Sequence, residues 1–411
     1  MQAVAQRLED MDIPYLDWAS PEFAANPYPH FEAARRKHPW IAKTDAGYAV
    51  FEYQAIRDLA GQDDKLRPSF DGIVELMGAV GTPWGRFTEE QMIGMPDREH
   101  ALMRTTFASK FTPRYANLLR PIMRETMERL LAEWTPGGQI DFEEFSSYYP
   151  VAVTTQMIGA PLEAIPELRK SMETMGLGMS LDPTRLPALN EAVQHLDKFC
   201  EALIADRRAN PHSADQPADL LDMLMEASDG GGISHRQLAD LLIFLFVAGY
   251  DTSKNVFTYM MRLMLDHPAI YQRCAEDHEY CRKVVEETLR VFNPSSNFRF
   301  TTEELVYRDV AIPANTMLFF TLNVSGRDAT AFDRADEFDP DRTIEPQRRQ
   351  LAFGLGKHMC LGQYIARAQL QEGIHLVAQH MREPKLAGEI GWRPFPGVWG
   401  IKGLPIQFEP A

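Results

Sequence analysis

Cysteine is scarce in this sequence. The 411 residues include four cysteines, Cys200, Cys274, Cys281 and Cys360, and no CxxC pair. Disulfide scaffolds and structural zinc sites need several closely spaced cysteines, so neither can be the basis of this fold. The pattern indicates a reducing compartment, and we expect a cytoplasmic protein.

Long apolar runs are absent as well. The most apolar segment runs from Leu241 to Gly249, which is less than half of the ~20 residues that a membrane-spanning helix needs. The N-terminal residues include acids and prolines where a signal peptide would have a basic start and then an apolar core. We therefore expect neither secretion nor a membrane partner.

Positive charge is the minority sign. The chain has 42 Lys and Arg against 58 Asp and Glu, a formal net charge of −16. Nucleic-acid binding relies on clustered cations that neutralise phosphates, so we expect no nucleic-acid partner. No GxGxxG motif follows a predicted strand, which excludes a built-in dinucleotide-binding reductase.

The composition is that of a globular enzyme. Hydrophobic residues make up 45% of the chain and charged residues 24%, which is enough for a large core. The stretches rich in proline and glycine are short and nothing repeats, so we expect one domain over residues 1–411.

Helical patterns dominate, with a small β element near the start. Residues 29–37 are typical of a helix, and residues 39–52 are typical of a hairpin. Thr112 predicts the start of a helix over 114–134, and Ser234 predicts the start of another in the middle of the chain. The first half of that second helix is apolar on every face, which indicates a central position. The predicted fold class is mainly α with a smaller β region.

One cysteine has an unusual setting, in the string 353-FGLGKHMCLG-362. Gly354, Gly356 and Gly362 allow backbone N–H groups to crowd the sulfur of Cys360, directly ahead of a helical pattern. Such a thiolate suits an iron ligand, because N–H donors tune the electron density that the sulfur gives to the metal. A buried structural cysteine is the commoner role for a single thiol, but it leaves the rest of the string unexplained.

A second unusual string, 248-AGYDT-252, falls inside the predicted central helix. Gly249 weakens the helix and Thr252 can bond a carbonyl one turn back, which predicts a local kink or a widened turn. Asp251 beside Thr252 in the resulting groove could pass protons to a molecule bound there. An ion-paired acid and a satisfied hydroxyl would also explain these two residues if they stood alone.

Both strings resemble signatures of the cytochromes P450. The first matches Phe-Gly-x-Gly-x-His/Arg-x-Cys-x-Gly, and the second matches (Ala/Gly)-Gly-x-(Asp/Glu)-Thr. Between them, 287-ETLR-290 resembles the ExxR of that family, and 334-RADEFDPDR-342 resembles the meander that follows it. The resemblance implies that Glu287, Arg290 and Arg342 form a structural network that supports the cysteine loop.

The resemblance covers nearly the whole chain and implies haem b as the cofactor. It implies the cytochrome P450 fold, in which haem lies between the long central helix and the helix that follows the cysteine loop. Cys360 is then the iron ligand, and Asp251 and Thr252 form the catalytic pair. Tyr250 departs from the usual pattern by its size and is expected to point away from the haem. The residues expected to bind the cofactor are His100, Arg104, Ala248, Arg299, Phe353, His358, Cys360 and Gly362.

The implied reaction is the insertion of one oxygen atom of O2 into a C–H bond, with electrons from separate redox proteins. We expect an iron–sulfur ferredoxin and an NAD(P)H-dependent ferredoxin reductase, with the ferredoxin steered by Arg98, Lys110 and Arg114. A haem-thiolate peroxygenase, an isomerase or a dehydratase would use the same cysteine but should not need Asp251 and Thr252. A non-enzymatic haem sensor would need a signalling domain, and none is visible.

The substrate is the least defined part of this interpretation. Position within the family and apolar character favour a medium-sized lipophilic molecule, with Ser295, Ser296 or Asn297 as one polar anchor. The residues expected to line its pocket are Met77, Trp84, Met175, Met179, Phe244, Val247, Ser295, Ser296, Phe298, Val398 and Trp399.

Overall fold

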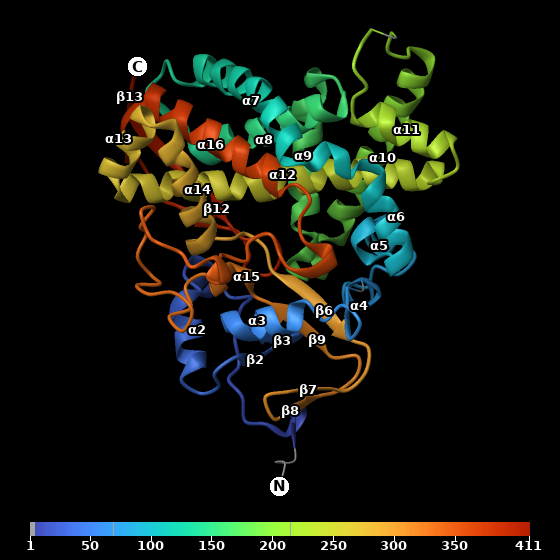
Figure 1. Ribbon diagram of the computed structural model, residues 1–411, viewed down its shortest axis with the longest axis vertical. Helices are drawn as coiled ribbons and strands as arrows, with labels where there is room; N and C mark the ends of the chain where they lie inside the picture. Colours follow the sequence, from blue (N-terminus) through green and yellow to red (C-terminus); the bar gives the residue numbers. More distant parts are fainter. Residues whose placement is uncertain (1–4, 69, 214) are drawn as a thin grey trace. The chain divides into compact units, whose positions relative to one another are not determined.

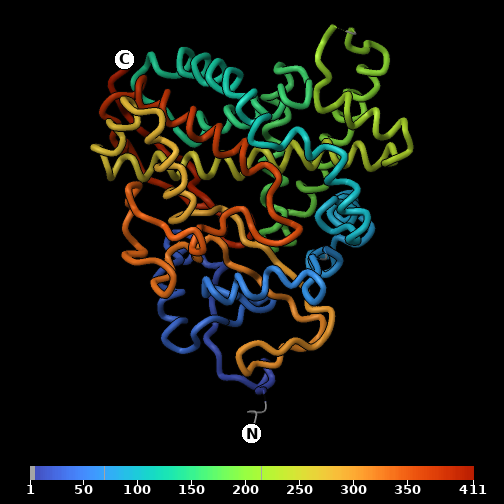
Figure 2. The backbone as a smooth tube through the Cα atoms, viewed as in Figure 1, coloured from blue at the N-terminus to red at the C-terminus, as the bar shows by residue number. Residues whose placement is uncertain are grey.

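The computed structural model describes residues 5–68, 70–213 and 215–411 (Figure 1, Figure 2). The chain divides into two compact units, each built from segments far apart in sequence. The first contains residues up to 69, 286–360 and 392–400, and the second contains residues 70–285, 361–391 and 401–411. Helices account for 58% of the chain, which confirms the mainly α fold class. The single-domain organisation stays a prediction.

The first unit contains most of the β structure. Its strands form a five-stranded sheet in the order β2-β3-β9-β6-β4 and a three-stranded sheet in the order β1-β8-β7. The elements of this unit are β1 (Gln6–Arg7), η1 (Leu8–Asp10), α1 (Pro21–Ala25), α2 (Tyr28–Arg35), β2 (Ile41–Thr44), β3 (Gly47–Val50), α3 (Tyr53–Ala60), β4 (Leu66–Arg67), β6 (Asn297–Thr301), β7 (Leu305–Tyr307), β8 (Val310–Ile312), β9 (Met317–Phe320), α15 (Leu322–Ser325), η7 (Pro346–Arg348) and η8 (Gly356–His358).

The predicted hairpin is confirmed by β2 and β3, which pair antiparallel with Thr44 opposite Gly47. Gly47 has a φ of +146°, and a Cβ atom there would lie 2.5 Å from the carbonyl oxygen of Met317. Only glycine therefore lets β3 approach β9, which pairs with it in parallel. Side chains from these strands and from α3 contribute to the core of the unit, among them Ile41 and Phe320.

The second unit is almost entirely helical. Its elements are α4 (Asp71–Leu76), α5 (Pro83–Glu90), η2 (Met92–Gly94), α6 (Asp97–Phe107), η3 (Ala108–Phe111), α7 (Pro113–Trp134), β5 (Gln139–Asp141), α8 (Phe142–Ile158), η4 (Leu162–Ala164), α9 (Ile165–Gly176), η5 (Gly178–Ser180), η6 (Pro183–Arg185), α10 (Leu186–Ala209), α11 (Leu220–Asp229), α12 (His235–Asp266), α13 (Pro268–Glu276), α16 (Gln363–His380), β10 (Met381–Leu386), β12 (Ile401–Lys402) and β13 (Pro405–Pro410). Two further elements, α14 (His278–Val291) and β11 (Gly391–Trp392), lie where the chain passes from one unit to the other.

The helix α12 is the centre of the second unit. It begins after Ser234, whose side chain accepts from the N–H of Gln237 in a capping box, and it packs against α8, α9, α10 and α16. The α-helix is unbroken through Gly249, so the expected widened turn does not interrupt it. A Cβ atom at Gly249 would lie 2.7 Å from the hydroxyl of Thr154. The glycine therefore allows α8 to pack closely on α12. No helix in the described part of the chain is long and apolar enough to span a membrane.

A buried ion pair in the first unit connects the end of α14 to the loops that follow. The Arg290 side chain is fully buried, and its Nε and Nη2 donate to the two carboxylate oxygens of Glu287 at 2.8 and 2.7 Å. Its remaining N–H groups donate to the carbonyls of Gly326, Ala335 and Glu337. Arg342 adds a contact of 3.3 Å to the same carboxylate. All five N–H donors of the Arg290 guanidinium therefore have acceptors.

We predict that Arg290→Ala lowers the free energy of unfolding by about 3–5 kcal/mol, because it leaves a buried carboxylate and three carbonyl groups without their donors. Urea unfolding of the haem-loaded protein measures the change. Arg334→Ala is the matched control, since Arg334 also pairs with Glu337 but lies at the surface. An unfolding midpoint shifted no more by Arg290→Ala than by Arg334→Ala would contradict this role.

Candidate active site

The cysteine string forms a tight loop in the first unit. Gly354 and Gly356 have φ values of +73° and +68°, a backbone conformation that favours glycine. The N–H of Cys360 donates to the carbonyl of Phe353 over 2.8 Å and closes the loop. The side-chain amide of Asn293 donates to Ala352 at 3.3 Å, which fixes the entry to the loop.

A second anchor comes from Asp63, beyond the end of α3. Its Oδ2 accepts from the N–H of Lys357 at 3.2 Å. A Cβ atom at Gly356 would lie 2.8 Å from the same oxygen, so this glycine is needed for the close approach as well as for its φ angle. The loop is therefore held by contacts with Phe353, Asn293 and Asp63 of the same unit.

Cys360 differs from the other cysteines in its exposure. Cys200, Cys274 and Cys281 are buried, whereas Cys360 is exposed, and all four are free thiols. Burial raises the pKa of the Cys200 thiol, which makes it a poor metal ligand. Cys360 is thus the one cysteine whose sulfur an external metal centre can reach.

Arg299 on β6 is a cation in an apolar setting. Its side chain is buried, its Nη1 donates only to the neighbouring carbonyl of Phe298 at 2.8 Å, and its Nε has no partner among the described residues. Burial lowers the pKa of Arg299, while the charge of Asp63 opposes the shift. A buried guanidinium with a spare donor suits a carboxylate ligand, so the residues present fit a haem propionate. His358 lies half-buried in η8, two residues before Cys360.

In the second unit, α12 leaves a narrow stripe accessible. Between Leu238 and Met261 most residues are buried, but Ala248 is exposed and five residues are half-buried, namely Phe244, Val247, Gly249, Thr252 and Ser253. Phe244, Val247, Ala248 and Thr252, the accessible stripe, lie at helical spacing on one face. A helix that is apolar all round thus presents one face on which a cofactor and an apolar substrate could lie.

The acid and the alcohol of the central motif have different environments. The Thr252 hydroxyl donates to the carbonyl of Ala248 at 3.2 Å, so it is held one helical turn back. Asp251 is buried, and its carboxylate accepts from the side-chain amide of Asn255 at 3.3 Å and faces the ammonium of Lys254 at 3.6 Å. The pair therefore combines an accessible hydroxyl with an ion-paired acid.

Tyr250, the departure from the family pattern, is fully buried on the far side of α12 from Ala248 and Thr252. Its ring centroid lies 5.5 Å from the ammonium of Lys254. Burial, and then the charge of Asp251, raise the pKa of the Tyr250 hydroxyl well above its ordinary value. It is therefore a neutral phenol.

The other expected cofactor contacts in this unit lie on α6. His100 is buried and Arg104 is half-buried one turn later, so the two share a helix face.

The predicted substrate-pocket residues fall in both units and stay predictions. In the second unit, Met77, Trp84 and Met175 are buried, and Met179 is half-buried. In the first unit, Ser295 is bridged to Val398, and both are half-buried, as are Ser296 and Phe298. Trp399 is buried in a cluster of rings, and its indole N–H donates to the carbonyl of Ala24 at 2.8 Å.

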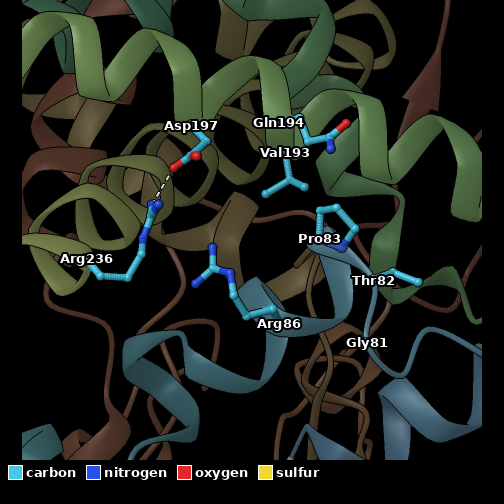
Figure 3. Close-up of a pocket in the computed structure, with 8 residues that line it drawn as sticks. All are labelled: Gly81, Thr82, Pro83, Arg86, Val193, Gln194, Asp197 and Arg236. Carbon is cyan, nitrogen blue, oxygen red and sulfur yellow. Dashed lines mark hydrogen bonds and ion pairs between the residues drawn. The ribbon is translucent and has the colours of Figure 1, made fainter.

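A separate pocket of about 370 Å³ lies between α5, α10 and the start of α12 (Figure 3). The carboxylate of Asp240 joins its two arginines, accepting from Arg86 at 2.8 and 2.9 Å and lying 3.0 Å from Arg236. The lining contains none of the predicted substrate-pocket residues, and consists of Gly81, Thr82, Pro83, Arg86, Val193, Gln194, Asp197 and Arg236.

Sequence reasoning missed Lys254. This lysine is fully buried and lies two residues after Thr252. The available signal was a charged residue inside an otherwise apolar helical stretch, because a lysine in such a place needs a buried partner. Its partner, Glu143, lies on α8 and is remote in sequence, so the pattern alone does not reveal it.

The sequence is similar to those of known proteins. The family model for cytochrome P450 matches residues 179–382. Luteothin monooxygenase of Streptomyces thioluteus is 31% identical over 405 residues, which cover 97% of both chains. Vitamin D(3) 25-hydroxylase of Pseudonocardia autotrophica is 28% identical over 410 residues, which cover 96% of both chains.

Solved structures share the fold. P450BioI, bound to an acyl carrier protein ligated to hexadec-9Z-enoic acid, matches 94% of this chain and 100% of its own with a TM-score of 0.85 and 24% identity. Epothilone D-bound P450epoK matches 96% of this chain and 99% of its own with a TM-score of 0.85 and 22% identity. With 31% identity to a monooxygenase along nearly its full length, and with its only exposed thiol at the end of a glycine-shaped loop, the chain belongs to the cytochrome P450 family, whose cofactor is haem b.

Proposed function

We propose that this protein inserts one oxygen atom of O2 into a C–H bond of a medium-sized lipophilic molecule, with electrons from an iron–sulfur ferredoxin and its NAD(P)H-dependent reductase. The observation that carries the proposal is the exposed thiol of Cys360 at the end of a loop that two positive-φ glycines and Asp63 shape. When bound there, haem b supplies O2 binding and the oxidising chemistry.

The residues of the first unit hold the cofactor in this proposal. Cys360 provides the thiolate ligand, and the closed loop fixes where its sulfur points. Arg299 pairs its spare donor with a propionate carboxylate, which offsets the cost of its burial. The network of Glu287, Arg290 and Arg342 holds the loops that lie between α14 and Cys360 in the sequence, and it takes no part in the chemistry.

The residues of the second unit manage protons and the substrate. Thr252 offers an accessible hydroxyl that can give up a proton. Asp251, on the same helix, offers a carboxyl group that can return a proton to that hydroxyl. A peroxygenase, an isomerase or a dehydratase would have less use for this pair, which favours the O2-dependent reaction. His100 and Arg104 are proposed as further propionate partners.

The accessible stripe favours an apolar substrate. Phe244 and Val247 contribute half-buried apolar surface on α12, and Phe298 contributes the same on β6. Ser296 donates to the side chain of Asn323 at 3.2 Å, so a substrate hydroxyl could join that polar pair. One relative named for vitamin D(3), and a structure in complex with an acyl carrier protein ligated to hexadec-9Z-enoic acid, support a lipophilic substrate class.

The first test replaces the proposed ligand. Cys360→His should retain part of the haem and lose the red-shifted Soret band that thiolate ligation gives to the reduced carbon monoxide complex. Cys200→Ala, which removes a buried thiol, is the control and should keep that band. A Cys360→His protein with an unchanged Soret band would show that another residue binds the iron.

The second test concerns the acid and the alcohol. Thr252→Ala should still consume NAD(P)H but divert most of it to hydrogen peroxide, because an ordered hydroxyl no longer places the proton. Asp251→Asn should slow product formation by about 10²-fold, in line with the loss of a general acid or base. Ser253→Ala changes the adjacent half-buried hydroxyl and should behave like the parent protein. Normal coupling in Thr252→Ala together with a normal rate in Asp251→Asn would limit the pair to a structural role.

The third test concerns the electron donor. Arg98 on α6 and Arg114 on α7 are exposed, so their reversal to Glu should raise the apparent KM for ferredoxin several-fold and weaken its salt dependence. Lys110→Glu should have a smaller effect, because its ammonium already donates to the carbonyl of Ala218 at 2.8 Å. Substrate binding should not change.

The matched control is Lys385→Glu on β10, an exposed lysine away from these helices in sequence. If the reversals at Arg98 and Arg114 affect ferredoxin kinetics no more than Lys385→Glu across a salt series, the donor binds elsewhere.

A further inference from the structure

The contact between α8 and α12 contains three buried charged residues, Lys254, Asp251 and Glu143. Lys254 is 0% exposed, Asp251 1% and Glu143 5%. The Lys254 ammonium lies 2.6 Å from Oε1 of Glu143 and 3.6 Å from Oδ1 of Asp251. One buried cation therefore lies between two buried carboxylates.

Stability alone does not account for this arrangement. Removing three ionisable groups from water costs several kcal/mol for each ion, and apolar side chains of similar volume are often as stable or more stable in such places. The neighbouring contacts of the same helices show that simpler solutions exist, since Ser146 and Thr258 join them with one neutral hydrogen bond of 2.8 Å. The three charged groups therefore need an explanation other than stability.

The charged groups continue to the surface. Oε2 of Glu143 lies 3.9 Å from the ammonium of Lys402, and that ammonium lies 2.6 Å from Oε1 of Glu173 on α9. The Lys402 side chain is 54% exposed. Alternating charges thus run from solvent at Lys402, through Glu143 and Lys254, to the acid of the central motif.

Other polar groups surround this run. The Tyr250 ring faces the Lys254 ammonium, and its buried hydroxyl has no partner among the described residues. The Asn255 amide donates to the Asp251 carbonyl at 2.7 Å. Arg169, which pairs with Glu144, adds a positive charge that acts on Tyr250. Lys254 is a cation in direct reach of Asp251.

We propose that Glu143 and Lys254 supply protons from the surface at Lys402 to Asp251. The inference rests on the proposed function, because inserting one oxygen atom and releasing the other as water consumes protons as well as electrons. An N–H bond of Lys254 breaks as an O–H bond forms on Oδ1 of Asp251. The Glu143 carboxylate takes a proton from solvent beside Lys402 and passes it to the neutral amine, so that the ammonium and the Glu143 carboxylate are both restored. Nothing is oxidised or reduced in these transfers.

The first measurement uses the resting protein and needs no turnover. Lys254→Met replaces the ammonium by an apolar chain of similar length and leaves two buried carboxylates together. Like charges in a buried site favour protonation of one partner, so the infrared spectrum should gain the carbonyl stretch of a protonated carboxylic acid. Adding Glu143→Gln or Asp251→Asn to Lys254→Met should remove that band in one of the two double variants. A Lys254→Met spectrum without the band would overturn the proposed coupling.

The second measurement is the pH profile of turnover. Lys254→Met and Glu143→Gln should each lower product formation by about tenfold or more, near the lower end of the effect of general acid–base catalysis. Their rates should fall more steeply than the parent rate as pH rises, because direct supply from water becomes limiting. Lys254→Arg should keep the ion pair but stay nearly as slow as Lys254→Met, because a guanidinium does not give up its proton. Lys402→Gln, a surface change that should not affect folding, should give a smaller loss with the same trend.

Lys385→Gln, an exposed lysine outside the run, is the control and should match the parent protein. Parent-like pH profiles and coupling in Lys254→Met, Glu143→Gln and Lys402→Gln would overturn the path. A parent protein that forms no oxygenated product from O2 would instead overturn the proposed function, and the infrared result on the resting protein separates the two failures.

Discussion

The first unit depends on one buried guanidinium. Arg290 uses all five of its N–H donors, two on the carboxylate of Glu287 and three on carbonyls that lie 36 to 47 residues further along the chain. Because these acceptors belong to irregular segments, no helix or strand would otherwise fix them. The segment from Gly326 to Glu337, which precedes the cysteine string, is therefore ordered by a side chain.

The second unit is built around a helix, α12, that is apolar on nearly every side. Apolar packing by itself would give this helix no chemical function. Two departures give it chemistry: a stripe of partly exposed residues that includes Ala248 and Thr252, and a buried run of charges on another face. Asp251 belongs to the second and adjoins the first in sequence. This placement allows one residue to link the supply of protons to their use.

Local patterns were predictable from sequence because local physics decides them. The hairpin of β2 and β3 follows from alternation and a glycine turn, and the starts of α7 and α12 follow from Thr112 and Ser234 as caps. The cysteine loop was predictable because two of its glycines, Gly354 and Gly356, have positive φ angles that few other residues adopt.

Tertiary pairings were beyond the sequence. Lys254 meets Glu143 across 111 residues, and nothing in the α8 pattern identifies which of its acids turns inward. The widened turn expected at Gly249 does not interrupt the helix. The glycine instead lets Thr154 of α8 pack closely against α12. The near isolation of Arg299 depends on burial, which only the folded chain defines.

The central claim is that the sulfur of Cys360 binds the haem iron. X-ray absorption at the iron edge of the resting, haem-loaded protein tests it most directly, because sulfur scatters differently from nitrogen and oxygen and forms a longer bond to the metal. The account predicts one sulfur neighbour of the iron, which is lost in Cys360→His. An iron surrounded only by nitrogen and oxygen in the parent protein would contradict it.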